Sequence, residues 1–366
     1  MTDSWPRQLL EWYNAHARDL PWRNPPGAVL PTGENWPYRV WLSEVMLQQT
    51  TVEAATPYFH AFTARWRDVA ALAAAADADV MQAWAGLGYY ARARNLLACA
   101  RAVVARHGGR FPASEAELRD LPGIGDYTAA AVVAFGFGRD VVVIDGNVER
   151  VVTRLFAIAI PLPAARAAIR AALTPLVPPG HAGDFAQAIM DLARRVCTAR
   201  SPRCLACPLA DACAARAAGT QASFPVKAAK KARPTRRGTA WWIEADGHVL
   251  TTVRPAKGLL GGMRALPSCD WRGAGEPPLA GDWQSLGLVR HGFTHFDLEL
   301  AVAALHLPGR PVLDLPGAAW LALDAVEAAG LPTLFAKAAQ LRLGPDTSGG
   351  LPLPANKGTR RHDKFP

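Results

Sequence analysis

Four of the chain's six cysteines lie within seventeen residues, and this cluster constrains the fold more than any other feature of the sequence. The spacing is Cys197-x6-Cys204-x2-Cys207-x5-Cys213. In a reducing compartment, such clustering favours a metal site over disulfide bonds. Four thiolates in one loop can bind a tetrahedral zinc ion as well as a cubane iron–sulfur cluster, so the geometry alone leaves the metal open. The remaining two, Cys99 and Cys269, are expected to be small apolar residues.

The overall composition describes a folded, basic chain. Its 366 residues, half of them hydrophobic, are enough for two or three domains with their own cores. Lysine and arginine number 40 against 31 aspartates and glutamates, which gives a net charge of +9. Such a surplus suits a polyanion, most commonly nucleic acid, although a basic tail on an ordinary protein would give the same numbers.

No segment of the sequence predicts export or membrane insertion. Residues 1–18 lack the apolar run of a secretion signal. The most apolar long stretch, 128–138, is too short for a bilayer, which needs about 20 residues. We therefore expect a cytoplasmic protein with no membrane partner.

Helix signals dominate residues 1–213 and predict an all-α region. Ser114 and Glu117 have the spacing of a capping box. Asp184 is expected to begin another helix, because apolar residues follow it at helical spacing. These residues are Phe185, Ile189, Leu192 and Val196. The stretch 38–50 is also expected to be a helix with a buried side.

The composition changes after the cysteine cluster. No acidic residue occurs from Ala212 to Ile243, and residues 214–237 are expected to be a basic interdomain linker. Strand-like alternation then predicts an α+β domain over residues 238–342. Its expected elements are strands at 240–243, 248–253 and 298–307 and a final helix at 318–342. The tail, 343–366, is expected to be disordered.

The stretch Leu121–Ala129 predicts a turn between two helices. Gly123 and Gly125 permit a tight turn with positive φ, and backbone N–H groups there can point at one phosphate. A simple helix–helix turn would have the same signature. The string LPGIGDYTA resembles the helix-hairpin-helix motif, which implies sequence-independent binding of phosphate.

Two carboxyl residues, Glu44 and Asp145, lie beside apolar runs. For Glu44 the spacing alone favours an exposed position on the polar stripe of a helix; if the residue is buried, desolvation raises its pKa. Asp145 is placed as a helix N-cap, where backbone donors would also lower its pKa and keep it anionic. One protonated acid and one carboxylate suit the cleavage of a glycosidic bond.

Several strings resemble, in order and spacing, the MutY-type adenine glycosylases over roughly residues 5–215. They are WLSEVMLQQT, GLGYYARARN, LPGIGDYTAA and VIDGNVERV, followed by a cysteine spacing similar to the iron–sulfur loop of these enzymes and of endonuclease III. The resemblance implies a helix-hairpin-helix glycosylase region, a six-helix barrel, with a structural [4Fe-4S] cluster on the four cysteines. It further implies a monomer acting on double-stranded DNA that contains A:8-oxoG or A:G mispairs.

The resemblance also assigns roles to residues near the two carboxyls. Glu44 is implied as the acid that protonates the leaving adenine and activates water, and Asp145 as the group that stabilises the sugar cation or attacks it transiently. Asn147 and Tyr127 are implied as their supports. Relatives similar to endonuclease III have a Schiff-base lysine where this chain has Tyr127, which implies a monofunctional glycosylase that leaves an abasic site.

A base must leave the helical stack before an enzyme can act on it, and the gap must be filled. By resemblance, Gln49 and Tyr89 wedge into the duplex with Leu47 nearby. Further candidates for the pocket are Trp22, Arg23 and Gln187. The segment 24–36 is longer than in the family, and Trp22 or Tyr89 could equally be core aromatics.

Residues 238–342 resemble the Nudix-like domain of the same family. No glutamate-rich metal box follows Pro267, so no magnesium-dependent pyrophosphatase is expected. The string HGFTHF resembles the family's 8-oxoguanine loop and implies lesion recognition by Phe293, Thr294 and His295, with a hydroxyl from Thr294. Without the family, His295 would be taken for a strand-end histidine.

Two alternatives remain open on the sequence alone. One is an endonuclease III-like glycosylase and lyase acting on another damaged base, which Tyr127 and the C-terminal domain speak against. The other is a non-catalytic iron–sulfur protein that binds DNA, which would not need the intact Glu44 and Asp145 motifs.

Overall fold

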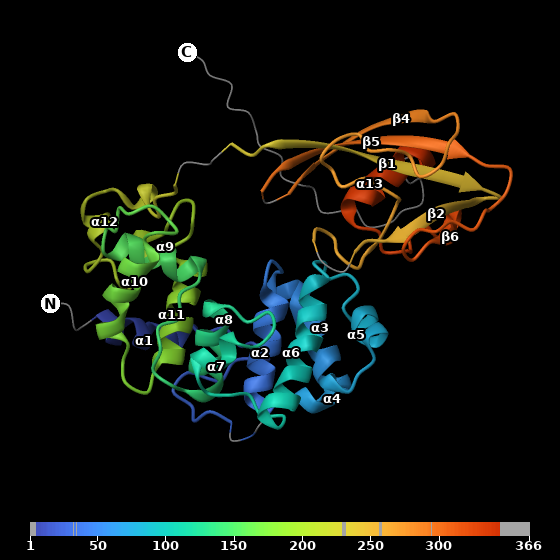
Figure 1. Ribbon diagram of the computed structural model, residues 1–366. Helices are drawn as coiled ribbons and strands as arrows, with labels where there is room; N and C mark the ends of the chain where they lie inside the picture. The colour runs from blue at the N-terminus through green and yellow to red at the C-terminus, as the bar shows by residue number, and fades with distance from the viewer. Residues whose placement is uncertain are drawn as a thin grey trace, which may run out of the picture. The chain divides into compact units, whose positions relative to one another are not determined.

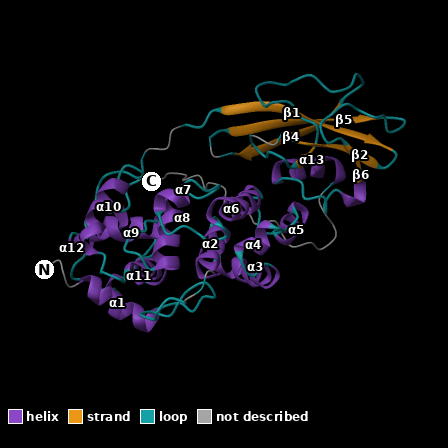
Figure 2. Cartoon of the chain, turned by 60° about the horizontal axis from the view of Figure 1, so that its bottom comes forward, coloured by secondary structure: helices purple, strands orange, loops and turns teal. Residues whose placement is uncertain are grey.

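The computed structural model describes residues 5–31, 33, 35–228, 232–255, 258–293 and 295–344. The chain forms two compact units, Met1–Ala229 and Lys230–Pro366. The first is built from helices, and the second from a sheet with helix α13 (Figures 1 and 2). This confirms the expected combination of an all-α region with an α+β domain. Of the expected tail, all but Leu343 and Gly344 lies outside the described residues.

The helical unit packs its elements around one hydrophobic core. Its helices are α1 (Trp5–His16), α2 (Asn35–Leu47), α3 (Val52–Arg65), α4 (Val69–Ala73), α5 (Asp77–Ala83), α6 (Ala91–His107), α7 (Glu115–Arg119), α8 (Asp126–Ala131), α9 (Gly146–Leu155), α10 (Arg166–Leu173), α11 (Ala182–Arg195) and α12 (Ala214–Ala217). A π-helical turn (Val132–Gly136) extends α8. In the described part of the chain, no helix is both long enough and apolar enough to cross a bilayer.

Helix α2 lies in the middle of this core, against α3, α6 and α8. Ten of its thirteen residues are buried, so it has no polar stripe for a glutamate to occupy. The helix ends at Leu47, three residues before the end expected from the sequence, and Gln49 then takes a left-handed backbone conformation with φ +59°.

The helix starts differ in part from those expected. Asp145 is the N-cap of α9, as its position indicated, and its side chain accepts from the backbone N–H groups of Asn147 and Val148. Ser114 is the N-cap of α7, but its side chain makes no capping bond, so the capping box is not formed. Helix α11 begins two residues before Asp184, which stands in its first turn, and its predicted apolar face is buried.

The segment expected as a linker, 214–237, is ordered at both ends. Helix α12 begins at Ala214, and Arg154 of α9 donates to the carbonyl of Phe224, which ties this stretch to the helical unit. Strand β1 already begins at Thr235.

The second unit is a mixed sheet of order β3-β2-β1-β5-β4, with β6 paired to β2. Its strands are β1 (Thr235–Ala245), β2 (His248–Val253), β3 (Arg264–Ala265), β4 (Gln284–Gly292), β5 (Asp297–His306) and β6 (Ala319–Ala322), and α13 (Thr333–Leu343) packs on β4. Strands β1 and β5 are parallel, whereas the other pairs are antiparallel.

The final helix predicted for 318–342 is wrong over its first half. Residues 319–322 form β6, because their backbone pairs with β2. Helix α13 begins only after Pro332, which stands at its N-cap. Strand β4 was not predicted from the sequence.

Candidate active site

A cavity of ≈ 510 Å³ lies inside the helical unit, where α2, α8, α9 and α11 meet. Among the residues that line it are Leu20, Trp22, Arg23, Val40, Ser43, Glu44, Leu47, Tyr127, Phe135, Asp145, Asn147, Arg150, Gln187 and Met190. The cavity therefore brings both carboxyl candidates together with Asn147 and Tyr127. Segments about a hundred residues apart in the sequence supply its walls.

Glu44 faces this cavity from the buried helix α2 and is 8% exposed. The pKa of its carboxyl is raised to about 7, chiefly by burial and to a smaller extent by the nearby charge of Asp145. A hydrogen bond from Tyr127 and the charge of Arg23 oppose the shift. The exposed position that helical spacing alone favoured for Glu44 is therefore wrong. With this pKa, its carboxyl keeps a proton up to near-neutral pH.

Asp145 is held by three donors at the start of α9. Its Oδ1 accepts from the N–H groups of Asn147 at 2.9 Å and Val148 at 2.7 Å, and its Oδ2 accepts from Asn147 Nδ2 at 2.7 Å. The expected lowering of its pKa is wrong, because burial outweighs these bonds and raises the pKa. The three donors nevertheless favour the anion, so Asp145 ionises before Glu44 does.

Tyr127 lines the same cavity as the two carboxyls. Burial raises the pKa of its phenol well above the usual value, and the negative charges of Glu44 and Asp145 add to this. The side chain is therefore a neutral hydrogen-bond donor to Glu44. It has no amine with which to form a Schiff base.

Arg23, the residue next to the long segment 24–36, is fixed by an ion pair. Asp191 of α11 is fully buried and binds Arg18 Nε at 2.6 Å and Arg23 Nη1 at 2.8 Å. Both arginines line the cavity, as does Arg194. Sequence reasoning missed Arg18 and Asp191, because they are 173 residues apart and no local pattern links them.

Trp22 and Gln187 also line the cavity. Trp22 packs edge-on against Phe59 with ring centroids 5.1 Å apart, so it is both a core aromatic and a wall residue. The Gln187 side-chain oxygen accepts from the Tyr13 hydroxyl at 3.0 Å, which leaves its amide nitrogen free to turn toward the cavity.

Arg150, a third residue missed from the sequence, links Asp145 to the cysteine loop. Its Nη2 donates to Asn147 Oδ1 at 3.1 Å, and Asn147 in turn binds Asp145. Its Nε donates to the carbonyl of Cys197 at 2.9 Å. Helix α9 thus contacts the carboxylate at its start and the cysteine loop one turn later.

The four clustered cysteines surround a small cavity of ≈ 30 Å³. Burial raises the pKa of Cys207 to about 11, and the other three thiols add to this shift, so bound cations are needed to keep the group as thiolates. Four thiols around one void are a donor set that suits an iron–sulfur cluster.

The two wedge candidates lie outside the cavity lining. Gln49 is exposed and Tyr89 is 63% exposed, with φ +59° and +49° respectively. Because Tyr89 is exposed, it is not a core aromatic, which was the alternative that the sequence left open. Leu47, at the end of α2, lines the cavity itself.

The turn expected between two helices is present before α8, with one difference. Gly123 has φ +76°, and a Cβ there would meet Asn95 Cβ at 2.8 Å, so only glycine fits. Gly125 has φ −99° and is the N-cap of α8, so the positive φ expected for it is wrong. Its backbone still leads into the exposed N–H groups at the helix start.

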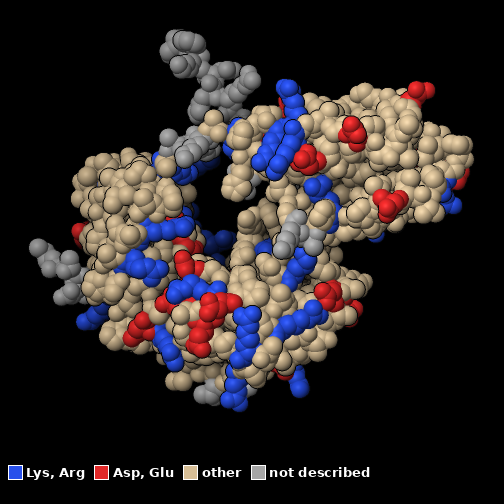
Figure 3. All heavy atoms as spheres, in the orientation of Figure 1, with Lys and Arg blue, Asp and Glu red and all other residues tan. Residues whose placement is uncertain are grey.

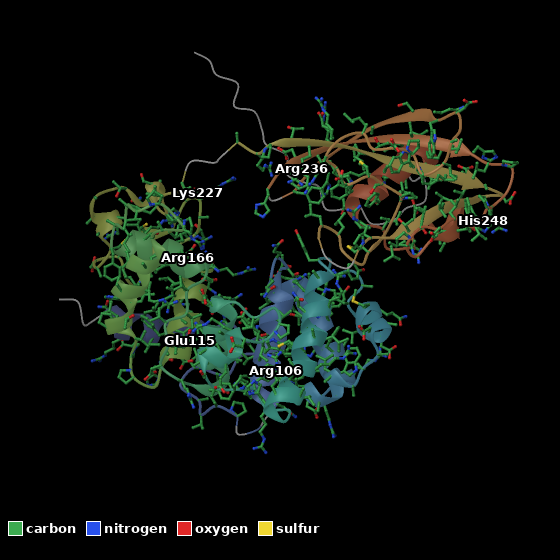
Figure 4. All side chains as sticks on the ribbon, viewed as in Figure 1. Arg106, Glu115, Arg166, Lys227, Arg236 and His248 are labelled. Carbon is green, nitrogen blue, oxygen red and sulfur yellow. The ribbon has the colours of Figure 1, made fainter. Side chains whose placement is uncertain are left out.

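In the second unit, the HGFTHF string joins β4 to β5. Phe293 stacks between Trp271 at 5.5 Å and Phe296 at 4.9 Å, whereas His295 is exposed. Thr294 lies outside the described residues. Three arginines around the start of β1 are exposed: Arg233, Arg236 and Arg237. Figure 4 labels Arg236, and Figure 3 shows basic side chains on the surface of this unit.

The folds and motifs of this chain are those of a base-excision DNA glycosylase. Residues 42–175 match the HhH-GPD superfamily of base excision DNA repair proteins, 197–213 match the iron–sulfur binding domain of endonuclease III, and 238–341 match the NUDIX domain. The chain is similar to the structure of a thermostable thymine-DNA glycosylase, with 27% identity and a TM-score of 0.52 over 58% of this chain and 95% of that one.

Two curated relatives narrow the class. The chain is 33% identical to the adenine DNA glycosylase of Homo sapiens over 90% of this chain and 72% of the human protein. It is 40% identical to the adenine DNA glycosylase of Mycolicibacterium smegmatis over 68% and 80% of the two chains. The chain therefore belongs to the adenine DNA glycosylases, hydrolases of N-glycosyl bonds in DNA, and its four clustered cysteines form the iron–sulfur site of this family.

Proposed function

We propose that this glycosylase removes adenine opposite 8-oxoguanine or guanine in double-stranded DNA and leaves an abasic site. The observation that supports it most is the pair of carboxyls in one cavity, with Glu44 protonated to near pH 7 and Asp145 held by three donors. Cleavage of a glycosidic bond requires one carboxyl that donates a proton and one that remains an anion, and this pair supplies both.

The adenine nucleotide first leaves the duplex and enters the cavity, while Gln49 and Tyr89 occupy its place. The backbone around Gly123 and the start of α8 binds a phosphate without reading sequence. The exposed position of both wedge residues and the tight turn at Gly123 support this step.

Glu44 then donates its proton to a ring nitrogen of adenine. The bond between sugar C1′ and adenine N9 breaks, and its electron pair leaves with the base. The sugar becomes an oxocarbenium-like cation beside the Asp145 carboxylate, which stabilises it electrostatically. The Glu44 carboxylate accepts a proton from water, which attacks C1′.

Tyr127 and Asn147 hold the two carboxyls in place. Tyr127 is a neutral phenol that cannot form an imine, which supports a monofunctional enzyme over an endonuclease III-like lyase. Arg150 and Arg154 of α9 donate to Cys197 and hold the cysteine loop against this helix, and a cluster bound by the four cysteines would fix the loop in this position. We propose a structural role for it.

The Nudix-like unit is proposed to read the base opposite the adenine. Phe293 is held in an aromatic stack, and His295 is exposed beside it. Thr294, the expected hydroxyl donor, lies outside the described residues. We further propose that the protein acts as a monomer on the nucleoid, in the cytoplasm.

Glu44→Gln tests the proposal directly. Duplexes with adenine opposite 8-oxoguanine, guanine or thymine are incubated with each protein, and abasic sites are counted. The wild type should act on the first two, whereas Glu44→Gln should bind the lesion duplex and release no adenine. Glu115→Gln, on the surface helix α7 (Figure 4), is the control and should match the wild type. Turnover by Glu44→Gln equal to the wild type would remove Glu44 from the mechanism.

A further inference from the structure

Arg92, near the start of α6, is a buried cation that the proposed reaction does not use. It is 8% exposed, and among the described residues no carboxylate pairs with it. Its guanidinium instead binds five oxygen acceptors. They are the carbonyls of Val45 (3.1 Å), Met46 (3.0 Å), Leu87 (3.0 Å) and Gly88 (3.2 Å) and the hydroxyl of Thr50 (3.1 Å).

The end of α2 explains why a charge is tolerated at this point. The last carbonyls of a helix have no partner within the helix, and the helix dipole makes this end negative. Arg92 binds two of these carbonyls and also lies 5.2 Å from the centre of the Trp84 ring. A planar guanidinium with this many donors fixes its partners in one geometry, which a lysine cannot do.

The acceptors of Arg92 flank the two wedge candidates. Thr50 follows Gln49 directly, and Gly88 precedes Tyr89. The Tyr89 ring itself lies 5.6 Å from the guanidinium. Both wedge residues have positive φ, a conformation that is unfavourable outside glycine and persists only where the surroundings impose it.

We infer that Arg92 is the positioning residue of the wedge. It holds the turn with Gln49 and the turn with Tyr89 side by side and ties both to the end of the helix that carries Glu44. The residues that displace adenine from the stack are thereby held in a fixed position relative to the acid Glu44. The inference rests on the proposed role of Gln49 and Tyr89 as the wedge.

Arg92→Met tests this, because methionine retains part of the apolar stem and lacks every donor. The first readout is single-turnover release of adenine opposite 8-oxoguanine. The second is the fluorescence of 2-aminopurine placed directly 3′ of the adenine, measured in the Glu44→Gln background so that no base is lost. The fluorescence rises when the neighbouring adenine leaves the stack.

We expect Arg92→Met to lose most of the fluorescence rise and to slow adenine release by about 10²-fold, the cost of a small misplacement. Arg92→Lys should recover part of both, since an ammonium can still reach some of the carbonyls. Arg101→Met is the matched control: Arg101 stands on the same helix and donates to the carbonyls of Ala73 and Ala75, but contacts neither wedge turn. It should leave both readouts unchanged.

A folded Arg92→Met protein with the wild-type rate and fluorescence would overturn the inference. Slow release with a full fluorescence rise would overturn it as well, because Arg92 would then act on the chemistry alone. If Arg92→Met does not fold, Arg92→Lys decides by the same two readouts. Failure of the proposed wedge has a different signature: the combined Gln49→Ala and Tyr89→Ala variant would keep the fluorescence rise.

Discussion

At the scale of single residues, burial is the main reason why Glu44 carries the proton in this site. Glu44 lies on a helix without a solvent-facing stripe, so the cost of a buried charge raises its pKa to about 7. Asp145 is nearly as deeply placed, but three donors point at its oxygens. Two carboxyls in one cavity thus separate into an acid and an anion through their local contacts.

Replacement of Asp145 by asparagine should separate its role as the N-cap of α9 from its proposed role as the anion beside the sugar cation. Asparagine is as good an N-cap as aspartate, so the thermal unfolding temperature should change little. The sugar cation loses its anion, however, and adenine release in single-turnover assays should slow by at least about 10²-fold. If Asp145→Asn releases adenine at the wild-type rate, the residue is only a cap.

The sequence predicted some residues of the cavity and missed others. The motif strings indicated Glu44 and Asp145, but spacing alone favoured an exposed glutamate, because the burial of α2 comes from α3, α6 and α8 rather than from its own pattern. Arg18 and Asp191 were not predictable, since their ion pair exists only once α11 packs against the N-terminal segment.

At the scale of elements, α9 joins the carboxylate to the cysteine loop. Asp145 caps its start, and Arg150, one turn later, donates to Asn147 and to the carbonyl of Cys197. A change at the cysteine loop can therefore move the carboxylate without any contact to the substrate.

Arg150→Met should weaken this link. We expect adenine release to slow, because Asn147 and with it Asp145 lose a fixed partner, while the visible absorbance of the cluster persists, since the four cysteines are intact. Arg166→Met is the control: Arg166 stands on α10, is largely exposed, and pairs with Glu149 (Figure 4). Loss of absorbance in step with activity would instead mean that Arg150 serves only the cluster.

Helix positions were more predictable than helix ends. The apolar spacing of α11 indicated its buried face correctly, because that face is a property of its own sequence. The end of α2 was placed three residues too late, since a distant arginine binds its last carbonyls. The segment 319–322 was assigned to a helix because its composition is helical, whereas pairing with β2 makes it a strand.

At the scale of the whole molecule, one chain combines a helical unit that contains the glycosylase cavity with a Nudix-like unit, for which we propose recognition of the opposing base. The cavity with Glu44 belongs entirely to the first unit, and the loop with Phe293 and His295 belongs to the second. The separation predicts that choice of the opposing base and cleavage of the glycosidic bond respond to different mutations.

His295→Ala in the full chain should reduce the preference for 8-oxoguanine over guanine by about tenfold, the value of one or two hydrogen bonds. The rate with adenine opposite guanine should stay near that of the wild type. His248→Ala, at the start of β2, should change neither (Figure 4). Equal losses on both substrates would place His295 outside lesion recognition.

The most direct test of the central claim is the pH dependence of single-turnover adenine release between about pH 5 and about pH 9. Glu44 acts only while protonated, so the rate should fall as pH rises through about 7, the pKa that burial gives this carboxyl. The rate should also fall on the acid side, where Asp145, whose pKa is raised, takes up a proton. A rate that is constant or rises through pH 7 would contradict the account.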